Sequence, residues 1–178
     1  MVHAAQYETF RRGSKTYFHS SRFFPLSVRE DVFVLYAFVR TADDFVDRVP
    51  QDGDGLFRFI DTYKLASGGR PAGDAIIDPF VALARRKEFR SEWIDAFFRS
   101  MRMDLEKKRH TTLKESIDYM YGSAEVIGLC MAQIMGLGPE AWDSARLLGR
   151  AMQYINFIRD IAEDNGFGRT YLPLSESP

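Results

Sequence analysis

The stretch Gly149–Pro173 reads GRAMQYINFIRDIAEDNGFGRTYLP and repeats polar residues at the helical spacing of three and four. These residues therefore share one stripe of a single helix, which runs from a small residue through two amides to acids. The members of the stripe are Gly149, Gln153, Asn156, Asp160 and either Glu163 or Asp164. Apolar packing beside the stripe is expected from Ile155, Ile158 and Ile161. Because a solvated face needs no such register, the stripe is either a plain polar surface or half of a binding site.

A second stretch, Leu35–Asp47, reads LYAFVRTADDFVD and carries a similar stripe. Its members are Tyr36, Arg40, Asp43 or Asp44, and Asp47. Two helices thus each hold an Asp-rich cluster flanked by arginine. Mg²⁺ prefers oxygen ligands and is usually shared between carboxylates and substrate phosphates. The two clusters therefore favour a Mg²⁺-bridged diphosphate site, although one such cluster alone is often only an acidic helix end.

In order along the chain, these motifs resemble those of the squalene/phytoene synthase family, the head-to-head prenyl diphosphate synthases. The matching segments are Ser14–Tyr17, Leu35–Arg40, Asp43–Asp47, Gln153–Asp164 and Gly168–Pro173. Several motifs in the same order are far more specific than either acidic cluster. The resemblance implies an all-α, isoprenoid-synthase-type helical bundle. It also implies Mg²⁺-dependent condensation of two prenyl diphosphates through cyclopropylcarbinyl diphosphate, giving squalene, dehydrosqualene or phytoene.

The resemblance also assigns roles to individual residues. The expected Mg²⁺ ligands are Asp43, Asp47, Asp160 and Asp164, supported by Asp44 and Glu163. The expected contacts to the substrate come from Lys15, Tyr17, Arg40, Gln153, Asn156, Arg159 and Arg169. The expected catalytic tyrosines are Tyr36, Tyr119 and Tyr171, because an aromatic face stabilises a carbocation. Mn²⁺ is a substitute for Mg²⁺, and NADPH is needed only in a squalene-forming enzyme.

Some of these roles have a plain structural alternative. Arg40 also fits an ion pair with the acids of its own helix. Arg169 and Tyr171 also fit a loop that caps the preceding helix. Tyr119 fits a helical core as well as a site. The choice between farnesyl and geranylgeranyl diphosphate as substrate stays open.

Tyr119 and the run Ser123–Gly128 resemble the family's motif of a tyrosine followed by small residues. Small residues on a helix that faces the bundle leave room for an isoprenoid chain, and they equally allow close helix contact. Glu125 departs from the motif, since the family usually has glycine there, and we expect it to face solvent or a neighbouring helix. An inward-facing Glu125 would alter the pocket for the isoprenoid tail. Gly13 is a milder departure, at a position where the family often shows a polar residue such as histidine.

With 178 residues and 46% hydrophobic content, the chain predicts a single domain, residues 1–178, around one core. The net charge of −1 gives no field that favours nucleic acid. The single Cys130 excludes an intramolecular disulfide and fits a cytoplasmic protein. No secretory signal pattern and no apolar run of about eighteen residues occurs. The basic runs Arg85–Lys87 and Lys107–His110 fit solvated helix ends, with peripheral contact to anionic lipid as the weaker alternative.

Hydrophobic periodicity predicts helices throughout the chain. The expected helices cover about 3–12, 25–47, 56–66, 76–87, 91–105, 112–135 and 139 onward, with 14–24 irregular or helical. Two capping boxes, Ser27-x-x-Glu30 and Thr112-x-x-Glu115, are predicted at the start of two of them. Gly136–Gly138 is expected to break one helix, and Pro139 to begin the last. No strand alternation competes, so the expected class is all-α.

Two other functions compete with the enzyme. A di-iron carboxylate bundle needs Glu-x-x-His pairs, and none of His3, His19 and His110 follows a glutamate by three positions. A non-catalytic assembly or scaffold relative, or an inactive fragment of such an enzyme, stays open, although the intact acidic clusters favour metal binding.

Family members continue for several helices beyond the segment that ends at Pro173, which implies a truncated domain here. The wall of the cavity left open is expected to drive self-association, or to accept the missing helices from a second chain. On its own, the chain is expected to form little coupled hydrocarbon, because an unshielded allylic cation reacts with water.

Overall fold

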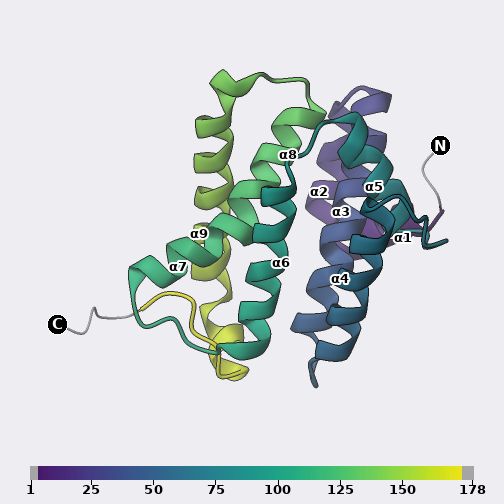
Figure 1. Ribbon diagram of the computed structural model, residues 1–178. Coiled ribbons are helices and arrows are strands. Elements are labelled where there is room, and N and C mark those ends of the chain that lie inside the picture. Colours follow the sequence, from purple (N-terminus) through teal and green to yellow (C-terminus); the bar gives the residue numbers. More distant parts are fainter. Residues whose placement is uncertain (1–3, 174–178) are drawn as a thin grey trace. The chain divides into compact units, whose positions relative to one another are not determined.

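The computed structural model describes residues 4–173, and every regular element within that range is a helix. The predicted all-α class is therefore confirmed (Figure 1). The chain forms two compact units, divided between Phe89 and Arg90. The single domain that the sequence suggests stays a prediction. Among the described helices, none combines the length and the hydrophobicity that a membrane crossing requires.

The first unit is built around α3, a helix of 22 residues. Its elements are α1 (Ala4–Gly13), α2 (Lys15–Ser20), the 3₁₀ turn η1 (Ser21–Phe23), α3 (Leu26–Asp47), α4 (Gly53–Ser67) and α5 (Ile77–Arg86). The helices α1, α4 and α5 all pack against α3, and aromatic rings fill the space between them. Phe38 of α3 stacks on Phe80 of α5 with 3.6 Å between ring centroids. Phe33 of α3 meets Phe10 of α1 edge-on at 4.9 Å. Because α3 is packed on several sides, the direction of its polar stripe is fixed.

The start of α3 differs from the prediction. The helix begins at Leu26, Pro25 occupies the cap position, and no side chain caps the free N–H groups. Ser27 therefore lies inside the first turn, and its predicted capping box with Glu30 is wrong. Proline gives the physical reason: its ring holds φ near the helical value and it has no N–H to satisfy, so a helix can begin directly after it.

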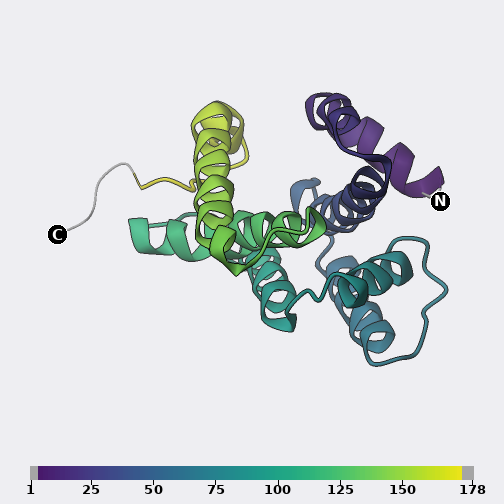
Figure 2. The same cartoon turned by 90° about the horizontal axis from the view of Figure 1, so that it is seen from above.

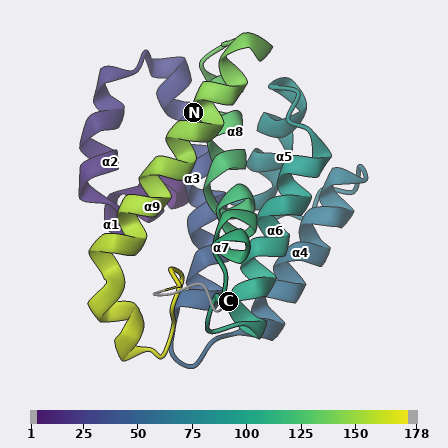
Figure 3. The ribbon, with the colours of Figure 1, turned by 90° about the vertical axis from the view of Figure 1, so that its left-hand side faces the viewer.

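The second unit contains two long helices that pack along a third helix, which a π turn interrupts. Its elements are α6 (Ser91–Glu106), α7 (Leu113–Met120), the π turn η2 (Tyr121–Glu125), α8 (Val126–Ile134), the 3₁₀ turn η3 (Pro139–Ala141) and α9 (Trp142–Gly166). The helix predicted over 112–135 consists of α7, η2 and α8, and the π turn places one extra residue inside it. The final helix α9 packs against α8 and η2, as Figures 2 and 3 show from two further directions. Pro139 begins the last helical segment, as predicted.

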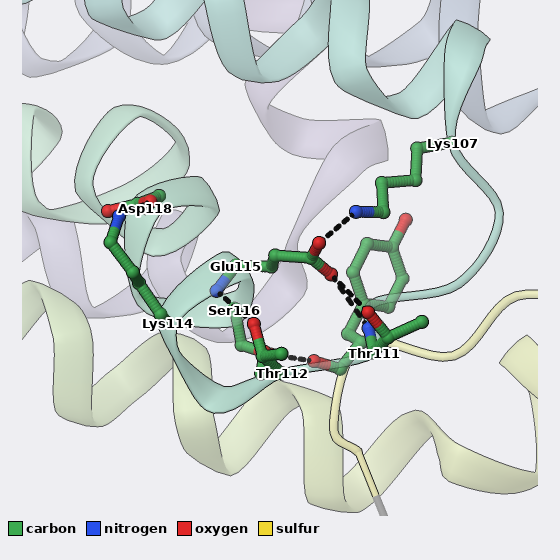
Figure 4. A network of polar contacts seen from close by, with 8 residues as sticks. Lys107, Thr111, Thr112, Lys114, Glu115, Ser116 and Asp118 are labelled. Atoms are coloured by element: carbon green, nitrogen blue, oxygen red, sulfur yellow. Dashed lines mark hydrogen bonds and ion pairs between the residues drawn. The ribbon is translucent and has the colours of Figure 1, made fainter. Parts of the chain in front are cut away.

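The N-terminus of α7 is held by a small polar network (Figure 4). Thr112 caps the helix, as predicted, and its Oγ1 accepts a hydrogen bond from the Glu115 N–H at 3.2 Å. The Glu115 carboxylate accepts from the N–H of Thr111 at 2.7 Å, rather than from that of Thr112. It also lies 2.7 Å from Lys107 Nζ. The bond from Lys107, followed by that from Thr111, lowers the pKa of Glu115 to about 2.

We predict that Glu115→Gln makes the stability of the protein less dependent on pH. A carboxyl whose pKa is lowered by folding stabilises the fold above its unfolded pKa, near 4.5, and loses that effect as the pH falls through its folded pKa of about 2. The wild type should therefore melt above the variant at neutral pH, and the difference should shrink between about pH 5 and pH 2. Thermal unfolding followed by circular dichroism at a series of pH values measures this difference.

Lys107→Met provides the matched control, because it removes the largest cause of the lowered pKa while keeping the carboxyl. It should reduce the same pH-dependent part of the stability. A difference between wild type and Glu115→Gln that stays constant down to pH 2 would contradict the role of the carboxylate charge.

Candidate functional site

The acidic stripe of α3 lies on a partly exposed face of the first unit. Tyr36, Arg40 and Asp43 are half-buried, whereas Asp44 and Asp47 are exposed. Arg40 Nη2 lies 2.6 Å from Asp44 Oδ1, one helical turn further on. Burial alone would lower the pKa of Arg40, but the carboxylates of Asp44, Asp43 and Asp47 together raise it above its ordinary value. The ion pair within the helix is thus present, and the role of Arg40 in substrate binding stays a prediction.

Tyr36 is held in place by α1. Its ring stacks on Phe10 with 4.0 Å between centroids and planes 21° apart. Burial raises the pKa of the Tyr36 hydroxyl. A Cβ atom at Gly13 would overlap that hydroxyl. Glycine at the position that departs from the family motif therefore leaves the space that the Tyr36 hydroxyl occupies.

The predicted substrate contacts on α2 are both exposed at the surface of the first unit. Lys15 begins the helix, and Ser14 caps it, since Ser14 Oγ accepts from the Tyr17 N–H at 3.2 Å. The roles of Lys15 and Tyr17 in substrate binding stay predictions.

The stripe of α9 is partly exposed in the second unit. Asn156 Nδ2 donates a hydrogen bond to Gln153 Oε1 at 3.4 Å, so the two amides are in register, as predicted. Arg159 donates to both oxygens of Asp160, from Nε and Nη2, each at 2.7 Å. These hydrogen bonds hold the pKa of Asp160 below its ordinary value. Asp160 therefore stays charged well below neutral pH.

The apolar packing predicted beside this stripe is wrong. Ile155, Ile158 and Ile161 are 62%, 54% and 45% exposed, so their own unit does not cover them. Phe157 is buried in their place, and its ring stacks on Tyr171 with 4.8 Å between centroids. The sequence pattern shows which residues of a helix are apolar, but it does not show which face the neighbouring helices occupy.

Two of the three predicted catalytic tyrosines meet at one buried carboxylate. Tyr119 Oη donates to Asp104 Oδ2 at 2.7 Å, and Tyr171 Oη donates to Asp104 Oδ1 at 2.8 Å. Burial, followed by the charge of Asp104, raises the pKa of the Tyr171 hydroxyl. The buried His110 ring lies 5.3 Å from the Tyr119 ring and 5.5 Å from the Tyr171 ring. We call Asp104, His110, Tyr119, Phe157 and Tyr171 the tyrosine cluster.

The loop after α9 is tied to the second unit through its backbone. The Arg169 N–H donates to the Asp164 carbonyl at 2.8 Å, which closes the end of α9. Thr170 forms backbone hydrogen bonds with the segment before α7, and Ser116 Oγ donates to the Tyr171 carbonyl at 2.5 Å. The loop therefore caps α9, in line with the structural alternative, and it also places Tyr171 in the tyrosine cluster.

Glu125 faces the neighbouring helix α9, which is one of its two predicted directions. It is fully buried, and its carboxylate accepts hydrogen bonds from Arg146 Nε at 3.0 Å and from Arg150 Nε at 2.6 Å. The arginine side chains are 38% and 35% exposed, so their charges reach solvent while the carboxylate does not. The residue that departs from the family motif thus links η2 to α9. We call these three residues the Glu125 clamp.

The helix α9 comes so close to α8 and η2 that two positions require glycine. A Cβ atom at Gly149 would lie 2.6 Å from the Ala124 carbonyl oxygen, and one at Gly128 would overlap the Ala145 carbonyl. Both obstacles are backbone atoms, which cannot turn aside as a side chain can. Of the two uses predicted for the small residues, close helix contact is therefore present at Gly128, and room for an isoprenoid chain stays a prediction.

The four predicted metal ligands are divided between the units. Asp43 and Asp47 lie on α3, and Asp160 and Asp164 lie on α9. Their joint role stays a prediction, and within residues 4–173 no group of three or more His, Cys, Asp or Glu is placed to hold a metal ion. The residue types nevertheless fit Mg²⁺, which takes only one or two carboxylates and completes its shell with water and substrate phosphate.

Sequence reasoning missed the residues that connect one helix to another. Asp104 lies 15 and 67 positions from its two tyrosine partners, and periodicity within a helix says nothing about such pairs. A signal did exist for the Glu125 clamp. Arg146 and Arg150 are spaced one helical turn apart, on the helix that follows the segment carrying Glu125.

The chain matches a family model described as squalene/phytoene synthase over residues 10–177. It is 33% identical over 182 residues to a 15-cis-phytoene synthase of Paracoccus sp. This alignment covers 93% of this chain and 58% of that protein. It is 34% identical over 170 residues to a phytoene synthase of Rhodobacter capsulatus. This alignment covers 93% of this chain and 50% of that protein. The chain therefore spans only about half the length of these relatives.

Solved structures that are similar to the chain include two synthases. A dehydrosqualene synthase crystallised with a ligand gives a TM-score of 0.88 at 25% identity, over 96% of this chain and 60% of that one. A squalene synthase from Alicyclobacillus acidocaldarius gives a TM-score of 0.79 at 23% identity, over 94% of this chain and 66% of that one. The predicted isoprenoid-synthase-type helical fold is confirmed.

We predict that the Glu125 clamp responds asymmetrically to mutation. Changing Arg146 and Arg150 to Gln leaves a fully buried carboxylate without compensation, and should lower the free energy of unfolding by about 3–5 kcal/mol. Glu125→Gln leaves two arginines that already reach solvent, and should cost only about 1–2 kcal/mol. Urea unfolding measures both changes. The triple variant should be more stable than the double arginine variant, and equal costs for the two changes would contradict the buried-charge explanation.

We also predict that Tyr119→Phe and Tyr171→Phe have coupled effects. Each removes one hydrogen bond to the buried Asp104 and should cost about 1–3 kcal/mol. Because both hydroxyls act on one carboxylate, a double-mutant cycle should show a coupling energy above about 0.5 kcal/mol. Tyr154→Phe, at a tyrosine of α9 that is 42% exposed, is the matched control and should change stability little. Strictly additive effects would mean that the two tyrosines act independently.

Proposed function

Because the chain belongs to the squalene/phytoene synthase family, we propose that it acts in the head-to-head condensation of two prenyl diphosphates. The observation that carries this proposal is the family match over residues 10–177, which includes both acidic stripes. Relatives at 33% and 34% identity are named phytoene synthases, and these names support geranylgeranyl diphosphate as substrate and phytoene as product. NADPH is needed only if the product is squalene.

The first chemical requirement is to stabilise a leaving diphosphate. When the C–O bond of an allylic diphosphate breaks, negative charge builds on the departing group, and cations aimed at that charge lower the barrier. Arg40, Arg159 and Arg169 offer guanidinium groups that bind phosphate with paired donors. Lys15 adds a point charge. Arg40 and Arg159 are already held by carboxylates of their own helices, so their positions are restricted before substrate binds.

The second requirement is a divalent cation. Mg²⁺, or Mn²⁺ in its place, would neutralise further charge on the diphosphate when bound. The residues proposed to hold it are Asp43, Asp47, Asp160 and Asp164. Carboxylates one turn apart repel each other, so each stripe gains from a bound cation. Gln153 and Asn156, which are hydrogen-bonded to each other, are proposed to orient the diphosphate or a metal-bound water.

The third requirement is to shield the allylic cation that remains. Tyr36, Tyr119 and Tyr171 are proposed to present ring faces, whose quadrupole attracts positive charge. Both hydroxyls in the tyrosine cluster donate to Asp104, which fixes the two rings. The raised pKa of Tyr171 favours its neutral form. Tyr171 therefore contributes through its ring rather than by giving up its proton.

We predict that Mg²⁺ and the diphosphate bind together. Titration calorimetry with a non-hydrolysable geranylgeranyl diphosphate analogue should show weak binding of Mg²⁺ alone and much tighter binding of the analogue when Mg²⁺ is present. Asp160→Asn should abolish this metal-dependent gain. It should lower the melting temperature only slightly, because the ion pair with Arg159 that it removes is open to solvent.

The matched control is Asp143→Asn, on the same helix, where the side chain is 93% exposed. It should bind the analogue as the wild type does. Equal affinity with and without Mg²⁺ would remove the metal bridge and favour the non-catalytic relative. An Asp160→Asn variant that melts much earlier and binds the analogue normally would make Asp160 a structural residue.

A further inference from the structure

The turn between α2 and α3 exposes apolar side chains at the surface of the first unit. Phe23 is 92% exposed and Leu26 is 61% exposed, with Pro25 also exposed between them. No other part of the first unit covers these side chains. Exposing almost the whole of a phenylalanine side chain to water is unfavourable. Burying such a ring would remove about 150–250 Å² of surface from solvent. We call residues 22–26 the exposed turn.

The exposed turn is held by local hydrogen bonds. Ser21 Oγ donates to the Phe18 carbonyl at 2.7 Å, and the Phe24 N–H donates to the Ser21 carbonyl at 3.1 Å. Pro25 then fixes the backbone where α3 begins. Phe23 is therefore presented outward by a defined turn.

A cavity of about 460 Å³ adjoins the exposed turn. Its lining combines apolar and charged side chains from α1, α2, η1 and α3. The lining residues are Tyr7, Phe18, Ser21, Arg22, Leu26, Arg29, Glu30 and Phe33. Aromatic contacts hold the apolar part together, since the Phe18 ring lies 5.3 Å from that of Tyr7 and 5.8 Å from that of Phe33. The cavity thus offers an apolar wall beside two guanidinium groups and the carboxylate of Glu30.

These two arginines differ from the basic residues that the sequence singled out. In the runs first considered for lipid contact, Arg86 and Lys87 pair with Asp31, and Lys107 pairs with Glu115. Neither Arg22 nor Arg29 forms an ion pair with any residue of the described range 4–173. The positive charge next to the exposed turn is therefore available to an external anion.

We propose that the exposed turn docks the protein on an anionic lipid bilayer. Phe23 and Leu26 enter the boundary between headgroups and acyl chains, and Arg22 and Arg29 bind lipid phosphates. An anionic surface attracts cations within a Debye length, which complements the two unpaired guanidinium groups. A lipid phosphate at the mouth of the cavity would have the aromatic wall beside its acyl chain.

The size of the exposed turn favours a bilayer over a protein partner. A stable protein interface buries about 800 Å² on each side. Two protruding side chains supply much less than that, whereas a bilayer gains from each apolar side chain that enters it. The combination of a small apolar projection with flanking cations therefore fits lipid better than a second folded surface.

A fluorescent label at position 23 tests the proposal without substrate or metal. Phe23→Cys can be labelled with an environment-sensitive fluorophore, because Cys130, the native cysteine, is fully buried and burial raises the pKa of its thiol. Phosphatidylcholine vesicles that contain phosphatidylglycerol should cause a blue shift and a gain in intensity, which diminish with added NaCl. Pure phosphatidylcholine vesicles should cause little change. The same label on Phe57→Cys, at a phenylalanine of α4 that is 47% exposed, is the matched control and should not respond.

The two arginines are tested by vesicle sedimentation of the unlabelled chain. Replacing Arg22 and Arg29 with Gln should lower the partition coefficient on anionic vesicles roughly 30-fold, the factor for two cations near such a surface. Replacing Arg58 and Arg70 with Gln changes the net charge equally and should have little effect. An equal loss in both pairs, or a label at position 23 that ignores anionic vesicles, would overturn the proposal. A response that appears without vesicles as the protein concentration rises would overturn it in favour of contact between copies of the chain.

Discussion

One buried negative charge sets the arrangement of the second unit. The Glu125 carboxylate has lost all contact with water, and a charge in that position is tolerated only where cations and hydrogen bonds replace its hydration. Arg146 and Arg150 supply both, and they can do so only when one face of α9 is turned toward η2. Counting along the same face from Arg150 leads to Gln153, then Phe157 and Asp160. The clamp therefore fixes the angle at which the amides and acids of α9 are presented.

Under the proposed function, the carboxylates of the two stripes have two possible partners, the arginines of their own helices and the divalent cation. In the unbound chain, Arg40 is held by Asp44 and Arg159 by Asp160. Two of the three arginines assigned to the diphosphate are thus already paired with an acid of the stripes that are assigned to the cation. Substrate binding would exchange these partners, from carboxylate to phosphate, and little net charge would have to be taken out of water. Under the proposed function, such an exchange would let stripes that are rich in acids bind an anionic substrate.

The sequence predicts what repeats along one helix, and it predicts poorly what joins two helices. Periodicity located the helices, and the Thr112 cap followed from side-chain chemistry that is local to one turn. The Ser27 cap failed because a neighbouring proline offered a competing start to the helix. The exposure of Ile158 depends on which helices lie around α9. The hydrogen bonds from Tyr119 and Tyr171 to Asp104 join segments that are far apart in the sequence. Such contacts arise from packing, for which a single sequence carries no periodic signal.

The π turn at Tyr121–Glu125 changes the direction in which side chains point on its two sides, so that α7 and α8 face different neighbours. A regular helix advances by about 100° per residue, so one residue added inside it turns everything beyond by that amount. Tyr119, before the turn, can face Asp104, while Glu125, at its end, faces α9. A deletion of one residue here would restore a regular helix and break one of these two alignments. The extra residue of the π turn is therefore what allows Tyr119 to contact Asp104 while Glu125 contacts α9.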